Sequence, residues 1–188
     1  MFKSMNKDCL MELANNIISK DDSVKISTLS DEITISQVVK FFEKQGRNFT
    51  KTMIQNYVRV GVLPPPVEKR YYTHDHLVLL TLIDSLKSIF SLEEIRMVLA
   101  PIRNNPEIFD DDILKTSDIY TDYLSMRKQA LAKWRDSLPE LFDNVEKSIE
   151  VNMVKDGEKN TVSSFMIALT IMAQTIAMRD LINEIIKE

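Results

Sequence analysis

The stretch that decides the fold is TKTMIQNYVRVGVLPPPVEKRYYT, residues 50–73. Thr50 is suited to the N-cap of a helix, because its side-chain oxygen can accept from the free N–H groups of the first turn. The apolar residues that follow recur at helical spacing: Met53, Ile54, Tyr57 and Val58. Gly61 and the prolines at 64–66 then stop the helix. The stretch predicts a short helix over residues 51–59, followed by a tight bend.

The opposite stripe of this helix is polar, and amides lie beside cations on it: Lys51, Thr52, Gln55, Asn56 and Arg59. An amide side chain places a donor next to an acceptor, the pattern that pairs with adenine N6 and N7 in the DNA major groove. After the prolines, residues 67–72 (VEKRYY) alternate and carry aromatic groups, which predicts a short two-stranded ribbon. Its polar and aromatic side chains are candidate DNA contacts: Lys69, Arg70 and Tyr71.

Charge is distributed unevenly along the chain. The net charge of the 188 residues is −4, yet residues 33–103 carry ten Lys and Arg against six Asp and Glu, a net +4. Residues 1–32 carry a net −2, and residues 104–188 a net −6. A phosphate backbone responds to local charge, because the Debye length is about 8 Å at physiological salt. The basic segment therefore suits nucleic acid despite the acidic total.

Helix signals surround the central stretch. Ser36 is expected to cap a helix over residues 37–45 that ends at Gly46, so two short helices joined by a turn predict a helix-turn-helix. Thr73 is expected to cap the next helix. A capping box, S-x-x-E at Ser91, predicts another over residues 92–102, with Pro101 perturbing its last turn.

These elements resemble the DNA-binding domain of MerR-family transcription regulators. The resemblance rests on ITISQVVKFF, TMIQNYVRVGVLPPP, RYYTHDHLVLLTLI and FSLEEIRMVL, which occur in the family's order and cover residues 33–103. The sequence looks closer still to an uncharacterised bacterial family that joins a MerR-like domain to a helical C-terminal region. The resemblance implies a winged helix-turn-helix that binds double-stranded DNA as a dimer.

One position departs from the MerR pattern. Members of that family usually carry Arg-Tyr-Tyr in the recognition helix, and the matching residues here are Gln55, Asn56 and Tyr57. Arg59 and Arg70 match basic positions of the family. Loss of one charge-assisted contact costs roughly 1.5–3 kcal/mol. Either the two amides compensate through base contacts, which we favour, or DNA binding is weak.

The remaining segments read as helical support. A helix over residues 6–19 is expected to pack on a neighbour, and residues 20–32 read as a linker. Residues 117–154 form a helical seam with a predicted break near Pro139, where Ser137 and Glu140 offer a new capping box. A turn at 155–160 leads to a last helix over 161–186, which is apolar around most of its circumference and is expected to be buried.

Several residues have a plainer and a sharper interpretation. Asp110, Asp111 and Asp112 are expected to favour a helix start rather than to bind a cation. His74 and His76 are expected to face phosphate or solvent rather than a metal. Cys9 is expected to be a bystander thiol. An effector pocket is conceivable but unsupported, and core packing is favoured, for five residues: Trp134, Met153, Phe165, Met166 and Met172.

Composition excludes several classes. A single cysteine rules out an intramolecular disulfide, and the N-terminus has no signal-peptide pattern. The longest apolar run, 165–178, is too short to span a bilayer, so we expect a cytoplasmic protein without a membrane partner. The sequence shows no nucleophile–base pair, phosphate-binding glycine loop or metal-spaced cluster. We therefore expect neither an enzyme nor a cofactor or metal site.

Together these patterns predict a mainly α protein in three parts. Residues 1–31 would form a helix and linker, residues 32–104 a MerR-like winged helix-turn-helix, and residues 105–188 a helical hairpin or small bundle that pairs subunits. The predicted function is a DNA-binding transcription regulator that acts as a homodimer. The alternative is a protein-interaction module on a winged-helix scaffold without sequence-specific DNA binding.

Overall fold

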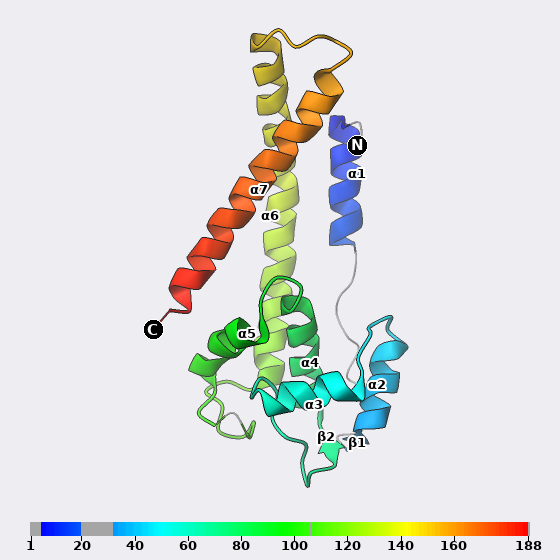
Figure 1. The fold of residues 1–188 in the computed structure, drawn as a ribbon, viewed down its shortest axis with the longest axis vertical. Coiled ribbons are helices and arrows are strands. Elements are labelled where there is room, and N and C mark those ends of the chain that lie inside the picture. Colours follow the sequence, from blue (N-terminus) through cyan, green and yellow to red (C-terminus); the bar gives the residue numbers. More distant parts are fainter. Residues whose placement is uncertain (1–4, 20–31, 106, 188) are drawn as a thin grey trace. The chain divides into compact units, whose positions relative to one another are not determined.

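A computed structural model describes residues 5–19, 32–105 and 107–187, and shows a mainly helical protein with one small antiparallel sheet (Figure 1). Two compact units make up the chain. One comprises Ser23–Leu124, and the other joins Met1–Asp22 to Ser125–Glu188. The predicted boundary after residue 104 falls inside the first of these units. Most of the predicted linker, residues 20–31, lies outside the described residues.

The unit of residues 23–124, here the N-proximal unit, contains most of the short elements. In order they are β1 (Ile33–Thr34), α2 (Ile35–Glu43), α3 (Lys51–Arg59), β2 (Tyr71–Tyr72), α4 (His74–Leu86), α5 (Leu92–Leu99), η1 (Ala100–Ile102) and the start of α6 (Thr116–Val151). β1 pairs antiparallel with β2, with Ile33 opposite Tyr72. The predicted ribbon within residues 67–72 is reduced to one antiparallel bridge, between Val67 and Tyr71. The second half of residues 67–72 pairs with the strand before α2.

The helix boundaries follow side-chain caps. The Thr50 hydroxyl accepts from the Met53 N–H at 3.1 Å, and α3 spans the predicted residues. The box of Ser91 and Glu94 is also confirmed, since each accepts from the other's backbone N–H. The predicted cap at Ser36 is wrong. Thr34 starts α2 instead, because its N–H donates to Gln37 Oε1 at 2.8 Å.

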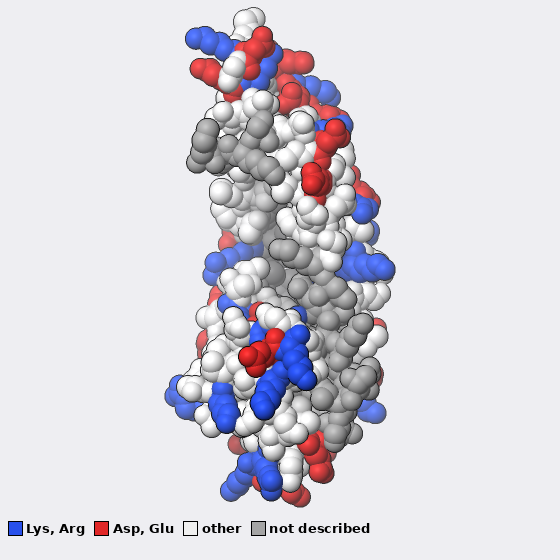
Figure 2. Space-filling view, turned by 90° about the vertical axis from the view of Figure 1, so that its right-hand side faces the viewer, with Lys and Arg blue, Asp and Glu red and all other residues white. Residues whose placement is uncertain are grey.

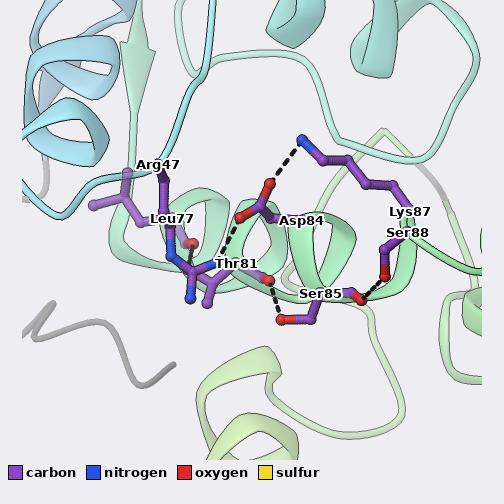
Figure 3. A network of polar contacts seen from close by, with 7 residues as sticks. All are labelled: Arg47, Leu77, Thr81, Asp84, Ser85, Lys87 and Ser88. Atoms are coloured by element: carbon purple, nitrogen blue, oxygen red, sulfur yellow. Dashed lines mark hydrogen bonds and ion pairs between the residues drawn. The ribbon is translucent and has the colours of Figure 1, made fainter. Parts of the chain in front are cut away.

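The core of the N-proximal unit is built around α4, which is buried from His76 to Ile83. α3 contributes Ile54 and Tyr57 to the same core, at 0% and 4% exposure. An ion pair fixes the turn before α3, since Arg47 Nη1 lies 2.7 Å from Asp84 Oδ2 on α4 (Figure 3). Because Ile54 and Tyr57 bury one face of α3 in the core, the opposite face of the helix is left at the surface.

Residues 103–105 and 107–115 form a loop rather than a helix start, which corrects the expectation for the three aspartates. Arg103 Nε lies 3.6 Å from Asp112 Oδ1, and both side chains are almost fully buried. Burial raises the pKa of Asp112 and lowers the pKa of Arg103, although each charge favours the other's ionised form. Asp112 therefore forms an internal ion pair with Arg103, and it does not lie at the start of α6, which begins at Thr116.

The second unit, here the terminal unit, consists of α1 (Lys7–Ile18), the part of α6 after residue 124, and α7 (Lys159–Ile185). Its core joins all three helices, and the buried residues are Leu10, Ala14, Leu138, Val145, Ile149 and Ile167. α6 runs without interruption through Pro139, so the predicted break is wrong. Ser137 donates to the Trp134 carbonyl at 2.7 Å instead of capping a new helix.

α7 is far more exposed than its apolar sequence led us to expect. Only 17% of its most apolar 18-residue window is buried. It is the one helix among the described residues that is long and apolar enough to cross a membrane by length and composition, which corrects the expectation that its apolar run is too short to do so. The predicted burial of this helix is therefore wrong, because α1 and α6 cover only its first half.

The five residues considered for an effector pocket do not converge. Trp134 and Met166 pack beside the core of the terminal unit, whereas Met153 is 89% exposed and Met172 59% exposed. An apolar groove of about 250 Å³ does lie beside Trp134, between α1 and α7. Leu13, Leu138 and Ile167 are among its lining residues.

Candidate nucleic-acid interface

The polar stripe of α3 lies at the surface of the N-proximal unit. Lys51, Thr52, Gln55 and Arg59 are exposed, and Asn56 is half-buried. Arg59 Nη2 donates to Asn56 Oδ1 at 2.7 Å. A carbonyl oxygen has two lone pairs, so Asn56 can still accept a second bond while Arg59 fixes its orientation. The stripe thus presents one freely exposed amide and one amide held by a guanidinium.

Tyr57 is a different case. It was predicted to contact DNA, but it is 4% exposed and packs in the core with Ile54. Its position three residues after Ile54 puts both side chains on the inner face of α3. We therefore leave Tyr57 out of the candidate surface and assign it to the anchoring of the helix.

Residues 68–70 form a tight exposed loop. Val67 and Tyr71 exchange two backbone hydrogen bonds, of 2.8 and 2.9 Å, around the three loop residues. Glu68 and Lys69 adopt φ values of 51° and 59°, the left-handed region that non-glycine residues rarely enter. The geometry holds Lys69 and Arg70 at the surface. The Arg70 guanidinium lies 5.1 Å from the centre of the half-buried Tyr71 ring.

α3 and the 68–70 loop border one cleft of about 230 Å³, here the α3–loop cleft. Gln55 enters it from the helix, and Lys69 and Arg70 from the loop. Its other lining residues are apolar or aromatic: Ile35, Val58, Pro66 and Tyr72. Sequence reasoning placed Val58 only in the core and gave Ile35 no role, because their shared position depends on the pairing of β1 with β2.

His76 is buried beside Tyr72, one of the residues that line the α3–loop cleft. The expectation that it faces phosphate or solvent is wrong. It is 1% exposed. Its Nδ1 accepts from the Thr73 N–H at 3.0 Å, and its Nε2 lies 3.2 Å from the Pro65 carbonyl. Burial lowers the pKa of His76 to about 4, and nearby Arg103 acts in the same direction. A neutral imidazole thus ties the proline bend to the start of α4.

The basic residues of the N-proximal unit include paired and unpaired side chains. Four are paired with acids: Arg47 and Lys87 with Asp84, Arg96 with Glu93, and Arg103 with Asp112. In contrast, Lys51, Lys69 and Arg70 are exposed and form no ion pair with an acid within the described parts of the chain. On the face shown in Figure 2, Lys and Arg cover more of this unit than Asp and Glu. The charges of α3 and the loop are thus available to an anionic ligand.

Among residues 5–19, 32–105 and 107–187, no group of three His, Cys, Asp or Glu side chains is placed to hold a metal ion.

The comparison with known proteins defines the class of the chain. Residues 14–123 match a family described as a domain of unknown function, DUF1836. The chain belongs to this family. No curated protein and no solved structure matches this chain.

Proposed function

We propose that this protein is a DNA-binding transcription regulator whose residues 32–104 act as a winged helix-turn-helix. The observation that carries the proposal is the α3–loop cleft, where an exposed amide on a helix and two cations on a loop face one space. Base-edge readout needs the amide, and backbone binding needs the cations. The resemblance to MerR regulators supports the same assignment.

In the proposed complex, α3 enters the major groove with Gln55 against base edges. Asn56 and Arg59 would act as one unit, because their hydrogen bond fixes the amide before DNA arrives. Lys69 and Arg70 would bind phosphates of the flanking backbone. Val58 and Tyr72 line the same cleft and offer an apolar surface to a deoxyribose.

The regulator would act as a homodimer on an inverted repeat. A single α3 of nine residues reads only a few base pairs, and a two-fold pair of subunits doubles that footprint. The charge distribution agrees with this division of labour. The net +4 segment of residues 33–103 would face DNA, and the net −6 segment of residues 104–188 would face the partner subunit and solvent.

The test is selection of bound sequences from random DNA, followed by affinity measurements on the selected site and on unrelated DNA. We expect an inverted repeat. Gln55→Ala should reduce discrimination between the two DNAs by about 1–3 kcal/mol, whereas Arg70→Ala should weaken both alike and lower the salt slope by about one.

Matched controls are available in the same unit. Gln45→Ala removes an exposed amide outside the cleft, and Arg96→Ala removes an arginine already paired with Glu93. Neither should change discrimination. The proposal fails if no sequence is enriched, or if Gln55→Ala and Gln45→Ala are indistinguishable.

A second function, protein interaction without DNA reading, is favoured by one observation. α7 exposes large apolar residues along its length, which suits a protein partner. Failure to enrich any DNA sequence, together with an unchanged fold, would select this second function.

A further inference from the structure

Four of the seven exposed large apolar residues of α7 lie on one face of the helix, whereas Met178, Leu181 and Ile185 lie on the opposite face. Phe165, Leu169, Met172 and Ile176 follow one another at steps of four, three and four residues. These steps are the a and d spacing of a coiled-coil heptad, so the four side chains lie along one narrow stripe of the helix. Their exposures are 45%, 45%, 59% and 61%. We name this stripe the α7 seam.

The seam lies on the side of α7 opposite its own core. Ser163, Ser164 and Ile167 are the buried residues of α7, and they face the core with α1 and α6. Positions 163 and 167 are four apart and share a face, whereas 165 and 169 are displaced from them by about half a turn. Folding of the terminal unit thus leaves the seam at the surface.

The area of the seam suits a specific interface. At roughly 200 Å² for a fully exposed large apolar side chain, the four residues leave on the order of 400 Å² open. That size lies within the roughly 300–600 Å² of the largest apolar patch on a typical monomer, a patch that is often functional. It also fits as the apolar centre of an interface that takes about 800 Å² from each partner.

The composition around the seam indicates a protein partner rather than a lipid bilayer. Gln174 and Thr175 lie within the apolar window, and Arg179 and Asp180 follow the seam directly. All four are exposed. A bilayer would have to bury Gln174 and Thr175, whereas the polar rim of a helix pair leaves them in water, and Arg179 and Asp180 lie beyond the apolar stretch in either case.

We propose that the α7 seam pairs with the α7 seam of a second copy of this chain. Heptad spacing on one exposed helix is self-complementary, because knobs at a and d positions fit holes formed by the same pattern on a partner helix. The pairing gives the homodimer of the proposed function its interface, and it does not depend on DNA binding.

The test is the mass of the full chain by sedimentation, without DNA. We expect twice the 21.7 kDa of one chain. Met172→Glu should weaken the dimer by about tenfold or more, because it places a charge in the seam. Met126→Glu is the matched control, since Met126 is a similarly exposed methionine on α6, at 65%. It should leave the mass unchanged. A monomeric wild type, or equal effects of the two variants, overturns the proposal.

A second measurement covers the case in which Met172→Glu does not fold. In a Cys9→Ser background, Met172→Cys should form an intermolecular disulfide under mild oxidation, with itself if the paired helices are parallel or with Leu169→Cys in a mixed sample if they are antiparallel, and Met126→Cys should not. Absence of both cross-links overturns the seam. So does flotation of the wild type with phosphatidylglycerol vesicles that Met172→Glu abolishes. A monomer that still selects an inverted repeat would refute the seam alone, whereas a dimer that selects no DNA would refute the regulator alone.

Discussion

His76 shows how one buried side chain fixes local geometry. Its neutral imidazole accepts from the Thr73 N–H at the start of α4 and lies against the Pro65 carbonyl of the bend. Its ring also packs edge-on against Tyr72 and Phe109. A protonated ring would lose its acceptor nitrogen, and it would place a charge in a site already occupied by Arg103.

Titration of His76 should therefore contribute to the pH dependence of the free energy of unfolding. The pKa is 6.5 when unfolded and about 4 when folded, so between these values the unfolded chain binds a proton that the folded chain does not. The free energy of unfolding is then unaffected above pH 6.5 and falls as pH drops toward 4, by about 3 kcal/mol in total. Urea titrations at several pH values should show this fall.

Comparison with a variant separates His76 from carboxylates that titrate in the same range. His76→Gln keeps an acceptor at the third helical position, and its pH slope should be shallower than that of the wild type. Identical slopes in the wild type and His76→Gln would contradict the assigned role.

Glu68 carries an unfavourable backbone conformation at the rim of the α3–loop cleft. Its φ of 51° costs a non-glycine residue roughly 1 kcal/mol. Glu68→Gly should raise the free energy of unfolding by about that amount, and it removes a negative charge beside Lys69 and Arg70. The midpoint temperature of thermal unfolding and the affinity for DNA should both increase. Gly157→Ala, outside the cleft, is a control for loop glycine changes, and it should leave DNA affinity unchanged.

At the scale of the element, α6 continues as one helix where its sequence predicted a break near Pro139. A helix of 36 residues includes Pro139, which lacks the N–H that would bond to the Arg135 carbonyl. Buried residues on both sides of the proline explain why the helix persists, since Leu138 and Val145 lie in the core of the terminal unit. Tertiary packing outweighs the local preference.

Pro139→Ala should consequently stabilise the terminal unit. An interior proline costs about 3 kcal/mol relative to alanine in a helix, and loss of the half-buried ring offsets part of the gain, so we expect about 2 kcal/mol. The fluorescence of Trp134, the only tryptophan, should follow the urea transition of this unit. An unchanged or lower midpoint would show that the proline ring itself is needed in the packing.

At the scale of the whole molecule, two hydrophobic cores share no described residue. One is built on α4, and the other joins α1 to α6 and α7. The terminal unit thus combines the two ends of the sequence, although residues 1–31 and 105–188 read as separate parts.

Two cores predict two unfolding transitions. Trp134 fluorescence should report the terminal unit, and far-UV circular dichroism should report both units, so the two urea curves should not coincide. Leu138→Ala should move the fluorescence transition by about 2–5 kcal/mol. Ile54→Ala should move only the other phase. A single coincident transition for both probes would mean that the units unfold together.

The sequence by itself determined the local structure of this protein. Caps at Thr50 and Ser91, the stop at Gly61 and the helical spacing of apolar residues in 51–59 depend on neighbours within a few positions. The outward stripe of α3 was predicted for the same reason, since side-chain spacing fixes which residues share a face.

The tertiary structure decided everything that depends on distant partners. β2 pairs with β1 in addition to the bridge between Tyr71 and Val67, His76 and Tyr57 are buried, and α6 continues through Pro139. α7 has a core-like composition but an exposed surface, because burial requires enough neighbouring elements to cover a helix. Spacing along a chain specifies faces, and only packing specifies which faces are covered.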